Sequence, residues 1–206
     1  MLTSPAPAVV DDVVLAPFSS GELIALRVQN GGVLWQDSLS STARLTPLAS
    51  LNDISGGPAV ADGYVIATAQ SGVMTGFDLR TGQRIWTMPA GSLSIPLITG
   101  DVVYTVTTSG QVAAMSKLDG TVLWIKQLEN FKNAKKRKER TVWTGPLLAG
   151  NRLVVASSGG AVLLLDPRSG EVLKEMDVKS GVFVPPVIAN ETVYILTDDA
   201  KLVAFK

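Results

Sequence analysis

The chain contains neither histidine nor cysteine. Without histidine there is no serine–histidine or cysteine–histidine catalysis, no histidine metal site and no histidine pH switch. Without cysteine there is no disulfide, no thiolate nucleophile, no cysteine zinc site and no iron–sulfur ligation. These two absences remove most of the residue sets from which catalytic and metal centres are built.

Charge is scarce and balanced: 17% of the 206 residues are charged, and 18 Lys and Arg match 18 Asp and Glu. The balance argues against nucleic acid as a partner, because phosphate binding needs a basic surplus. No stretch approaches the ~18 apolar residues of a membrane helix, and the first residues lack the pattern of a signal peptide. We therefore expect neither a membrane span nor a signal peptide in this chain.

Prolines mark an internal repeat; they are Pro7, Pro58, Pro96, Pro146 and Pro186. Each is followed by a short apolar strand, a turn of Asp, Gly or Asn, and a second strand rich in Val and Ile. Fourteen residues after the prolines stand Gly21, Gly72, Gly110, Gly160 and Ala200. Twenty-four residues after the first four stand Gly31, Gly82, Gly120 and Gly170, and twenty-eight after them stand Trp35, Trp86, Trp124 and Lys174.

The repeat predicts an all-β fold. Four antiparallel strands recurring every ~40–50 residues are typical of the blades of a β-propeller, and a sandwich of similar strands explains the ungapped repetition less well. We expect one partial propeller domain with blades at about 1–54, 55–92, 93–142, 143–182 and 183–206. The fifth blade has three strands, which favours an open arc from the C-terminal part of a longer chain; a closed ring of five blades is the alternative.

The segment from Gly76 to Trp86 reads GFDLRTGQRIW. It resembles the tryptophan-docking motif of quinoprotein propellers, A-x-D-x-x-T-G-x-x-x-W. In this motif Asp and Thr fix a turn, Gly permits it, and the Trp ring docks against a neighbouring blade. The docking residues predicted here are Trp35, Trp86, Trp124, Gly82 and Gly120, whereas the fourth copy has Lys174 in place of Trp.

The enzymes among the quinoprotein propellers bind pyrroloquinoline quinone and calcium through a vicinal cysteine pair, an Asp base and carboxylate or amide ligands. This chain has no cysteine, and acidic residues such as Asp62 and Asp101 fall in expected turns. It also has no calcium loop, P-loop or G-x-S-x-G elbow. We therefore expect no catalytic, cofactor or metal residues. A dehydrogenase fragment and a ligand-sensing propeller stay open as alternatives.

A closer resemblance is carried by the segment Leu51–Pro58, LNDISGGP, and by the ending PPVIANETVYILTDDAKLVAF. Both are similar to the BamB family, lipoprotein scaffolds of the outer-membrane β-barrel assembly machinery. The resemblance implies a non-enzymatic scaffold in the periplasm, associated with the outer membrane, that binds the periplasmic repeats of BamA and other subunits of the machinery. Ser55 replaces a second acidic residue of the family's loop. The family's signal peptide and lipidated cysteine are absent from this chain, as expected if an N-terminal part is missing.

Two linkers between copies are long: 23 residues separate Trp35 from Pro58 and 22 separate Trp124 from Pro146, against 10 and 12 in the other two. Long loops on a rigid scaffold are common binding sites. The first linker combines apolar and charged side chains, and it predicts a partner-binding set of Arg44, Leu48, Leu51, Asp53 and Ile54. The alternative is a surface loop whose leucines fold back onto the blades.

The second long linker carries six basic residues and one acidic residue between Lys132 and Arg140. A solvated loop is the simplest interpretation of such a run. A contact with an acidic partner or anionic lipid headgroups is the functional alternative, and it would involve Lys135, Lys136, Arg137 and Lys138. RNA binding is less compatible, because no aromatic platform accompanies the run.

Overall fold

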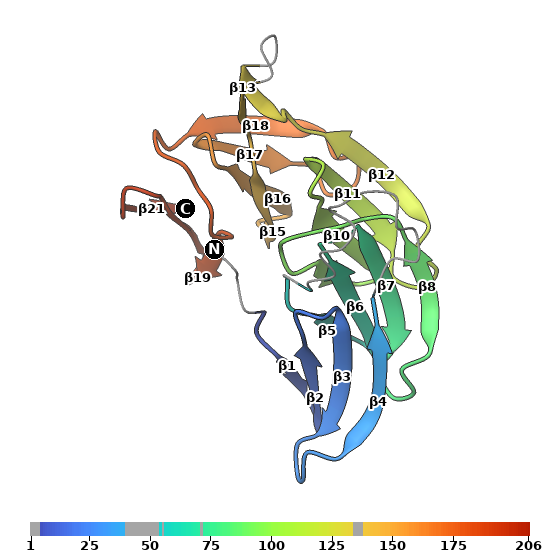
Figure 1. The fold of residues 1–206 in the computed structure, drawn as a ribbon. Helices are drawn as coiled ribbons and strands as arrows, with labels where there is room; N and C mark the ends of the chain where they lie inside the picture. The colour runs from blue at the N-terminus through green and yellow to red at the C-terminus, as the bar shows by residue number, and fades with distance from the viewer. Residues whose placement is uncertain (1–4, 40–53, 55, 71, 134–137) are drawn as a thin grey trace. The chain divides into compact units, whose positions relative to one another are not determined.

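The computed structural model describes residues 5–39, 54, 56–70, 72–133 and 138–206. All regular elements in these residues are β-strands, and their pairing is antiparallel (Figure 1). The expected all-β architecture of four-stranded antiparallel sheets is therefore confirmed.

The first two sheets each contain four strands in sequence order. The first consists of β1 (Ala8–Val10), β2 (Val13–Pro17), β3 (Glu22–Arg27) and β4 (Val33–Ser38). The second consists of β5 (Ala59–Ala61), β6 (Tyr64–Ala69), β7 (Val73–Asp78) and β8 (Arg84–Met88). Both follow the strand order that the repeat predicts.

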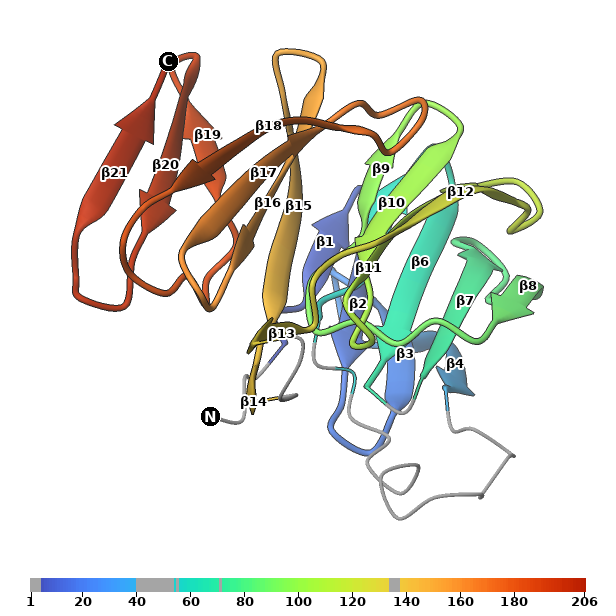
Figure 2. The same cartoon turned by 90° about the horizontal axis from the view of Figure 1, so that it is seen from above.

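The remaining sheets repeat this pattern (Figure 2). The third consists of β9 (Leu97–Thr99), β10 (Val102–Val106), β11 (Gln111–Ser116) and β12 (Val122–Gln127). The fourth consists of β15 (Trp143–Ala149), β16 (Arg152–Ser157), β17 (Ala161–Leu165) and β18 (Val172–Asp177). The fifth has three strands, β19 (Val187–Ala189), β20 (Thr192–Leu196) and β21 (Leu202–Phe205).

The second long linker forms more than the expected loop. It contains a two-stranded hairpin of β13 (Phe131–Asn133) and β14 (Lys138–Arg140). No pattern in the sequence predicts this hairpin, because its strands are three residues long and carry no alternation of apolar and polar side chains.

The chain divides into two compact units. One contains residues 1–103 and 115–121, and the other contains residues 104–114 and 122–206, so the boundary passes through the third sheet. The core of the first unit includes Leu15, Leu23, Val65 and Phe77, all fully buried. The core of the second includes Ala156, Val162 and Ile195, which are also fully buried.

Position within the sheet decides how apolar each strand is. The second strands β6 and β16 are buried along almost their whole length, and their sequences YVIATA and RLVVAS are nearly continuous apolar runs. Such runs are typical of strands covered on both faces. The fourth strands β12 and β18 are mostly exposed and include charged residues, as expected of sheet edges.

The turn between β7 and β8 shows how the docking motif builds its backbone. Asp78 Oδ1 accepts hydrogen bonds from the Thr81 amide at 2.8 Å and the Thr81 hydroxyl at 2.7 Å. These bonds lower the pKa of Asp78. The Gly82 amide donates to the Asp78 carbonyl at 2.9 Å, and Gly82 has a φ of 72°, which L side chains rarely adopt. The motif's Asp, Thr and Gly thus close a tight, hydrogen-bonded turn.

Each docking tryptophan in the first unit lies against the turn of the following sheet. The Trp35 indole donates from Nε1 to the Leu79 carbonyl at 2.7 Å, and its ring stacks on Phe77 with centroids 5.8 Å apart. A Cβ at Gly82 would lie only 2.5 Å from the Trp35 ring. Glycine is therefore required for space as well as for φ.

Trp86 repeats this contact one sheet further along. Its Nε1 donates to the Lys117 carbonyl at 2.9 Å, and a Cβ at Gly120 would come within 2.9 Å of the ring. A Cβ at Gly76, the cross-strand partner of Trp86, would lie 2.5 Å from the same ring. The ring is therefore held between the glycines of two sheets.

The same contact occurs in the second unit. Trp124 donates from Nε1 to the Pro167 carbonyl at 3.0 Å, and the Tyr104 hydroxyl donates to the same carbonyl at 3.1 Å. A Cβ at Gly170 would lie 2.5 Å from the Trp124 ring. In three consecutive copies, the indole thus donates to the carbonyl at the same repeat position of the next copy. In all three, its ring also packs against the glycine at the same repeat position of that copy.

Replacing Trp86 by Ala is expected to lower the free energy of unfolding by ~3–5 kcal/mol, because it leaves a large cavity and an unused carbonyl acceptor. Lys174→Ala changes the corresponding position of the fourth copy, where the side chain is exposed, and is expected to cost under ~0.5 kcal/mol. Urea unfolding of both variants measures the difference. Equal losses would contradict the register that aligns Lys174 with the docking tryptophans.

Gly31 and Gly82 have nearly the same positive φ, but only Gly82 contacts a docked ring. Replacing each by Ala therefore separates the stability lost through backbone strain from the stability lost through the clash with the ring. Gly31 has a φ of 68° and nothing within 4 Å of a built Cβ, whereas Gly82 has a φ of 72° and the Trp35 ring at 2.5 Å. Gly31→Ala is expected to cost ~1 kcal/mol. Gly82→Ala is expected to cost ~1–3 kcal/mol more, because the ring must move. Thermal and urea unfolding give both values, and similar costs would contradict the docking geometry.

Candidate protein-interaction surface

The predicted partner-binding set lies largely in the first long linker. Arg44, Leu48, Leu51 and Asp53 fall outside the described residues. Ile54, the last member of the set, is described and is fully buried in the core of the first unit. We therefore interpret Ile54 as an anchor of the linker.

Buried leucine and isoleucine side chains hold both ends of this linker. Leu39, directly before it, is fully buried in the same core as Ile54, and its amide donates to the Gly21 carbonyl at 2.8 Å. Anchored ends reduce the conformational entropy that a loop loses when it binds a partner. The linker therefore begins and ends at fixed points of the first unit.

An ion pair fixes the strand that leads into the linker. The Arg84 guanidinium on β8 donates to both carboxylate oxygens of Asp37 on β4, from Nε at 2.9 Å and from Nη2 at 2.5 Å. Nη2 also donates to the Ser38 carbonyl at 2.7 Å. The hydrogen bond to Asp37 raises the pKa of Arg84. Such bidentate pairs are geometrically specific, so Arg84 sets the direction of the chain at the linker's start. Sequence reasoning missed it, because 47 residues separate the partners.

Exposed apolar side chains lie beside the other end of the linker. A Cβ at Gly56 would lie 2.5 Å from the Ser94 carbonyl oxygen, and a Cβ at Gly57 would lie 3.4 Å from Ile95 Cδ1. The segment after Ile54 is thus packed against the β8–β9 connection, where Leu93 is 43% exposed and Ile95 is 52% exposed. These two residues form an apolar surface beside Gly56 and Gly57, the last described residues of the linker before Pro58.

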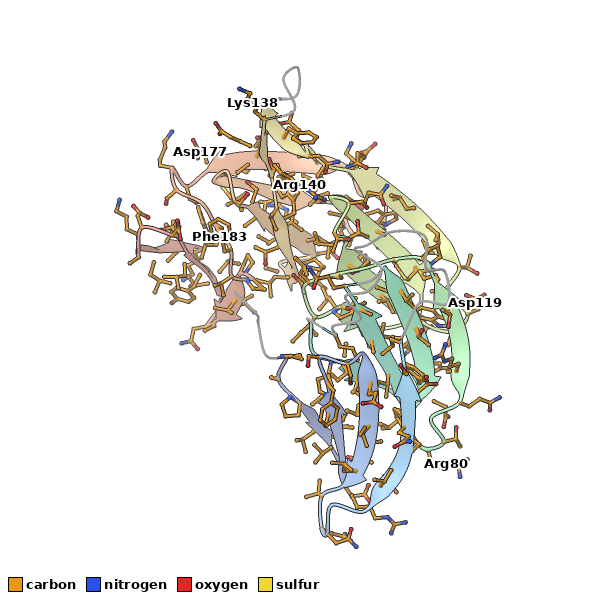
Figure 3. The ribbon with its side chains drawn as sticks, viewed as in Figure 1. Arg80, Asp119, Lys138, Arg140, Asp177 and Phe183 are labelled. Carbon is orange, nitrogen blue, oxygen red and sulfur yellow. The ribbon has the colours of Figure 1, made fainter. Side chains whose placement is uncertain are left out.

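The basic residues of the second long linker are only partly described. Lys135, Lys136 and Arg137 fall outside the described residues. Lys138 is exposed on β14, and Arg140 donates to the Thr108 carbonyl at 3.0 Å. Figure 3 shows both side chains on the β13–β14 hairpin, with Asp177 and Phe183 labelled on β18 and the connection after it. Trp143 follows the hairpin and is packed, since its Nε1 donates to the Glu129 carbonyl at 2.9 Å.

A polar cavity of about 210 Å³ lies between this hairpin, the β16–β17 turn and the β18–β19 connection. Arg140 and Lys179 line it together with Ser158 and Ser180. Lys179 is paired with Asp177 at 3.2 Å, and Arg140 is bonded to a carbonyl. Asp177 offsets the charge of Lys179, and Glu139, which also lines the cavity, offsets that of Arg140, so little net positive charge is left for an anion there.

A buried lysine joins three turns of the first unit. Lys117 Nζ donates to Asp62 Oδ2 at 2.7 Å, lies 3.7 Å from Asp101 Oδ1, and lies 5.2 Å from the centroid of the Tyr64 ring. Its side chain is 3% exposed, while the two carboxylates are 74% and 76% exposed. Lys117 also offers its carbonyl to Trp86. The third copy thus uses this position both to dock an indole and to bind two neighbouring turns.

No three His, Cys, Asp or Glu side chains come together in a way that could hold a metal ion, within the part of the chain that the structure describes. In the same part, no helix is long and apolar enough to cross a membrane. Arg80 and Asp119 project from the β7–β8 and β11–β12 turns (Figure 3); the hydrogen bond from the Thr121 amide lowers the pKa of Asp119, which belongs to a turn.

Asp62→Ala is expected to destabilise the chain more than Lys117→Met. The first change leaves a buried ammonium group without its nearest partner, at a cost of ~1–3 kcal/mol, while the second removes the charge, keeps the apolar stem and leaves two exposed carboxylates, at under ~1 kcal/mol. Urea unfolding near neutral pH measures both. A larger loss in Lys117→Met would contradict this interpretation.

The Lys117–Asp62 pair is expected to make the stability of the fold depend on pH in the alkaline range. The hydrogen bond to Asp62 raises the pKa of Lys117 above its ordinary value of 10.5. A raised pKa in the folded state contributes stability that is fully present below 10.5 and is lost as the pH rises through the raised value. The wild type is therefore expected to lose more stability above this pH than Lys117→Met does, measured as the difference between their unfolding free energies at each pH. Parallel curves would contradict the assignment.

The family model and the curated relatives carry the same name. The family model for "Outer membrane protein assembly factor BamB" matches residues 1–126 and 109–206. The protein of that name from Legionella pneumophila (strain Paris) is 29% identical over 199 residues, which are 97% of this chain and 50% of the relative. The chain therefore spans about half the length of the curated relatives it matches.

Solved structures give the fold. The crystal structure of BamB from Moraxella catarrhalis has a TM-score of 0.84 at 23% identity, covering 99% of this chain and 59% of that one. The β-propeller domain of Cps50 (Swd1) from Myceliophteria thermophila has a TM-score of 0.71 at 14% identity, covering 94% of this chain and 61% of that one. The fold is that of a β-propeller, as the repeat predicts.

Proposed function

Because the chain belongs to the outer membrane protein assembly factor BamB family, we propose that it is a non-enzymatic scaffold of the machinery that assembles outer-membrane proteins. The observation that carries the proposal is the family match along the whole chain, over residues 1–126 and 109–206. A scaffold needs rigid blades that present loops, and it needs no catalytic group. We place its site of action in the periplasm, at the outer membrane.

We infer that the partner is the periplasmic part of BamA and that the first long linker binds it. The linker's ends are held by Leu39 and Ile54, and Arg84 fixes the strand that precedes it. Leu93 and Ile95 add exposed apolar surface beside its end. Apolar centres with a charged residue near them are typical of binding hot spots. In this arrangement Leu48 and Leu51 supply the apolar contact, and Asp53 and Arg44 supply the charges.

The role of Asp53 depends on how deeply the partner covers it. If the partner buries Asp53 against a cation, Asp53→Ala is expected to weaken binding by ~2–5 kcal/mol. If Asp53 lies at the rim of the interface, the same change is expected to cost under ~1 kcal/mol and to lower mainly the association rate. Ser55 cannot share the charge, so the electrostatic contribution of this side of the loop rests on Asp53.

The test measures binding of the purified periplasmic domain of BamA by calorimetry and surface capture. We expect Leu48→Ala/Leu51→Ala to weaken binding at least about tenfold. We expect Asp53→Ala to weaken binding and to leave it less dependent on salt than the binding of the wild type, because the attraction that salt screens has been removed. Ile54→Ala is left out, because removing a fully buried isoleucine costs ~2–5 kcal/mol of stability. Each variant is first checked for native unfolding behaviour.

Lys138→Glu serves as the matched control, because it changes an exposed charge on the hairpin of the other long linker. It is expected to leave binding unchanged. Undiminished binding by the folded Leu48→Ala/Leu51→Ala variant would move the interface away from the first linker, and loss of binding in Lys138→Glu would place it at the basic hairpin.

A further inference from the structure

The polar cavity beside the β13–β14 hairpin has walls that hydrogen bonds hold in place. On one side, the Val142 amide donates to Ser158 Oγ at 2.9 Å, and the Ser158 amide donates to the Val142 carbonyl at 2.8 Å. On the other side, the Val182 amide donates to the Ser157 carbonyl at 2.9 Å, and the Val182 side chain is buried. The described lining residues belong to the second unit and all precede the fifth sheet. The cavity is therefore formed before a ligand arrives, which reduces the entropy lost on binding.

Two of the lining residues have an unusual backbone conformation. Glu139 has a φ of 58°, and Lys179 has a φ of 68°. Residues other than glycine, asparagine and aspartate rarely adopt a positive φ, because their Cβ then crowds the backbone. The Lys179 amide donates to Asp177 Oδ1 at 2.8 Å, which holds this conformation in place. Backbone strain that the surrounding structure maintains is concentrated at binding sites.

The lining offers hydrogen-bond donors and acceptors with almost no net charge. Arg140 and Lys179 are balanced by Glu139 and by Asp177, which pairs with Lys179. Side-chain hydroxyl groups are added by Thr141, Ser158 and Ser180. An anion would meet repulsion as well as attraction here, and an apolar group would displace water without replacing its hydrogen bonds. A neutral group with several hydroxyls suits the cavity, because each hydroxyl donates one hydrogen bond and accepts two.

An exposed phenylalanine lies at the edge of the cavity. Phe183 is 57% exposed, although the preceding residue, Val182, is buried. A Cβ on the lining residue Gly181 would lie 3.1 Å from Phe183 Cε2, so the ring lies against the cavity wall on the β18–β19 connection (Figure 3). A hexose carries hydroxyls around its ring and C–H bonds on its faces, and C–H groups pack well on the electron-rich face of an aromatic ring. An aromatic ring beside a neutral polar cavity therefore matches both surfaces of a hexose.

We propose that the polar cavity binds one neutral hexose ring, free or as one unit of a glycan, with its C–H face on Phe183 and its hydroxyls in the cavity. Arg140 and Lys179 donate hydrogen bonds to these hydroxyls, and Glu139 accepts from them. The volume of about 210 Å³ is below the ~300–1,000 Å³ of sites for drug-sized ligands, which limits the occupant to a single ring. The site uses no residue assigned to the BamA contact, so either proposal can fail without the other.

The test measures amide chemical shifts of the isotope-labelled chain at Ser158, Ser180 and Gly181. The ligands are the methyl glycosides of galactose, glucose, mannose and N-acetylglucosamine. We expect at least one to bind with a Kd of about 1–10 mM. Sorbitol, a polyol without a ring face, is expected to bind at least about tenfold more weakly. The absence of shifts with all four glycosides, or equal binding of sorbitol, would overturn the proposal.

Three further ligands distinguish other occupants of the cavity. Tighter binding of galactose 6-phosphate than of methyl galactoside would indicate an anion site, and equal or tighter binding of triglycine with blocked ends would indicate a peptide site. Either result would overturn the proposal. Lactose separates the two sources of a hexose if galactose is bound. Tighter binding of lactose than of methyl galactoside would identify a unit of a glycan, and equal binding would identify a single sugar.

Phe183→Ala removes the aromatic surface and is expected to weaken glycoside binding at least about tenfold without changing the melting temperature, because the side chain is mostly exposed. Phe18→Ala is the matched control, because it removes a 44% exposed phenylalanine from the first unit; it is expected to leave binding unchanged. Undiminished binding by Phe183→Ala would overturn the proposal.

Glu139→Gln tests the charge balance, because it keeps the size of the side chain and removes its charge. It is expected to weaken binding of the neutral glycoside at least about threefold and to strengthen binding of galactose 6-phosphate. Lys138→Gln is the control for a charge change on the same strand outside the lining, and it is expected to change neither affinity. Unchanged affinities in Glu139→Gln would overturn the assignment of the hydroxyl acceptor.

Discussion

The contact between a tryptophan ring and the glycine of the following copy determines how these sheets pack. The indole needs a flat space of fixed depth, a backbone carbonyl for its N–H, and a residue without Cβ beneath it. Leu79, Lys117 and Pro167 supply the carbonyl although their side chains have nothing in common. Because the acceptor is a backbone carbonyl, any side chain is tolerated at the acceptor position. The glycine position tolerates no other residue, because a Cβ there would clash with the ring. The third copy shows the result: Lys117 keeps the acceptor and uses its side chain to bind Asp62.

Departures from the repeat are compensated within the same sheet. The third copy has Ser116 in place of the motif's Asp, yet its turn closes with the same backbone bond from the glycine amide, Gly120 to the Ser116 carbonyl at 3.0 Å. The fourth copy exchanges the sizes of a cross-strand pair, with Leu164 in the place of a small residue and Lys174 in the place of the ring. The leucine covers part of the sheet that an indole would cover. The exchange leaves apolar walls without the ring that normally fills the space between them.

Much of this could be read from the sequence, because propeller strands are short and local. Turn glycines, β-branched runs and the fixed spacing from Pro58 to Trp86 place the strands without any tertiary information. What the sequence could not give are contacts between distant side chains. The Arg84–Asp37 pair spans 47 residues and the Lys117–Asp62 pair spans 55, and neither lies in a recognisable motif. The mix of apolar and charged side chains in the first long linker predicts a binding role for Ile54, whereas its burial depends on packing with Leu39, Trp35 and their neighbours.

Docking also has a direction along the chain. In every described case the ring belongs to the earlier copy and the carbonyl to the later one, at separations of 44, 31 and 43 residues. During synthesis, the indole of each copy therefore leaves the ribosome before the turn that supplies its acceptor carbonyl. The ring stays exposed until that turn has been synthesised and has folded. Assembly in this order runs from the N-terminus, with never more than one unsatisfied ring at the growing end. The interface between the fourth and fifth sheets has Lys174 at the docking position, so β19–β21 is attached without the indole contact that joins the earlier copies.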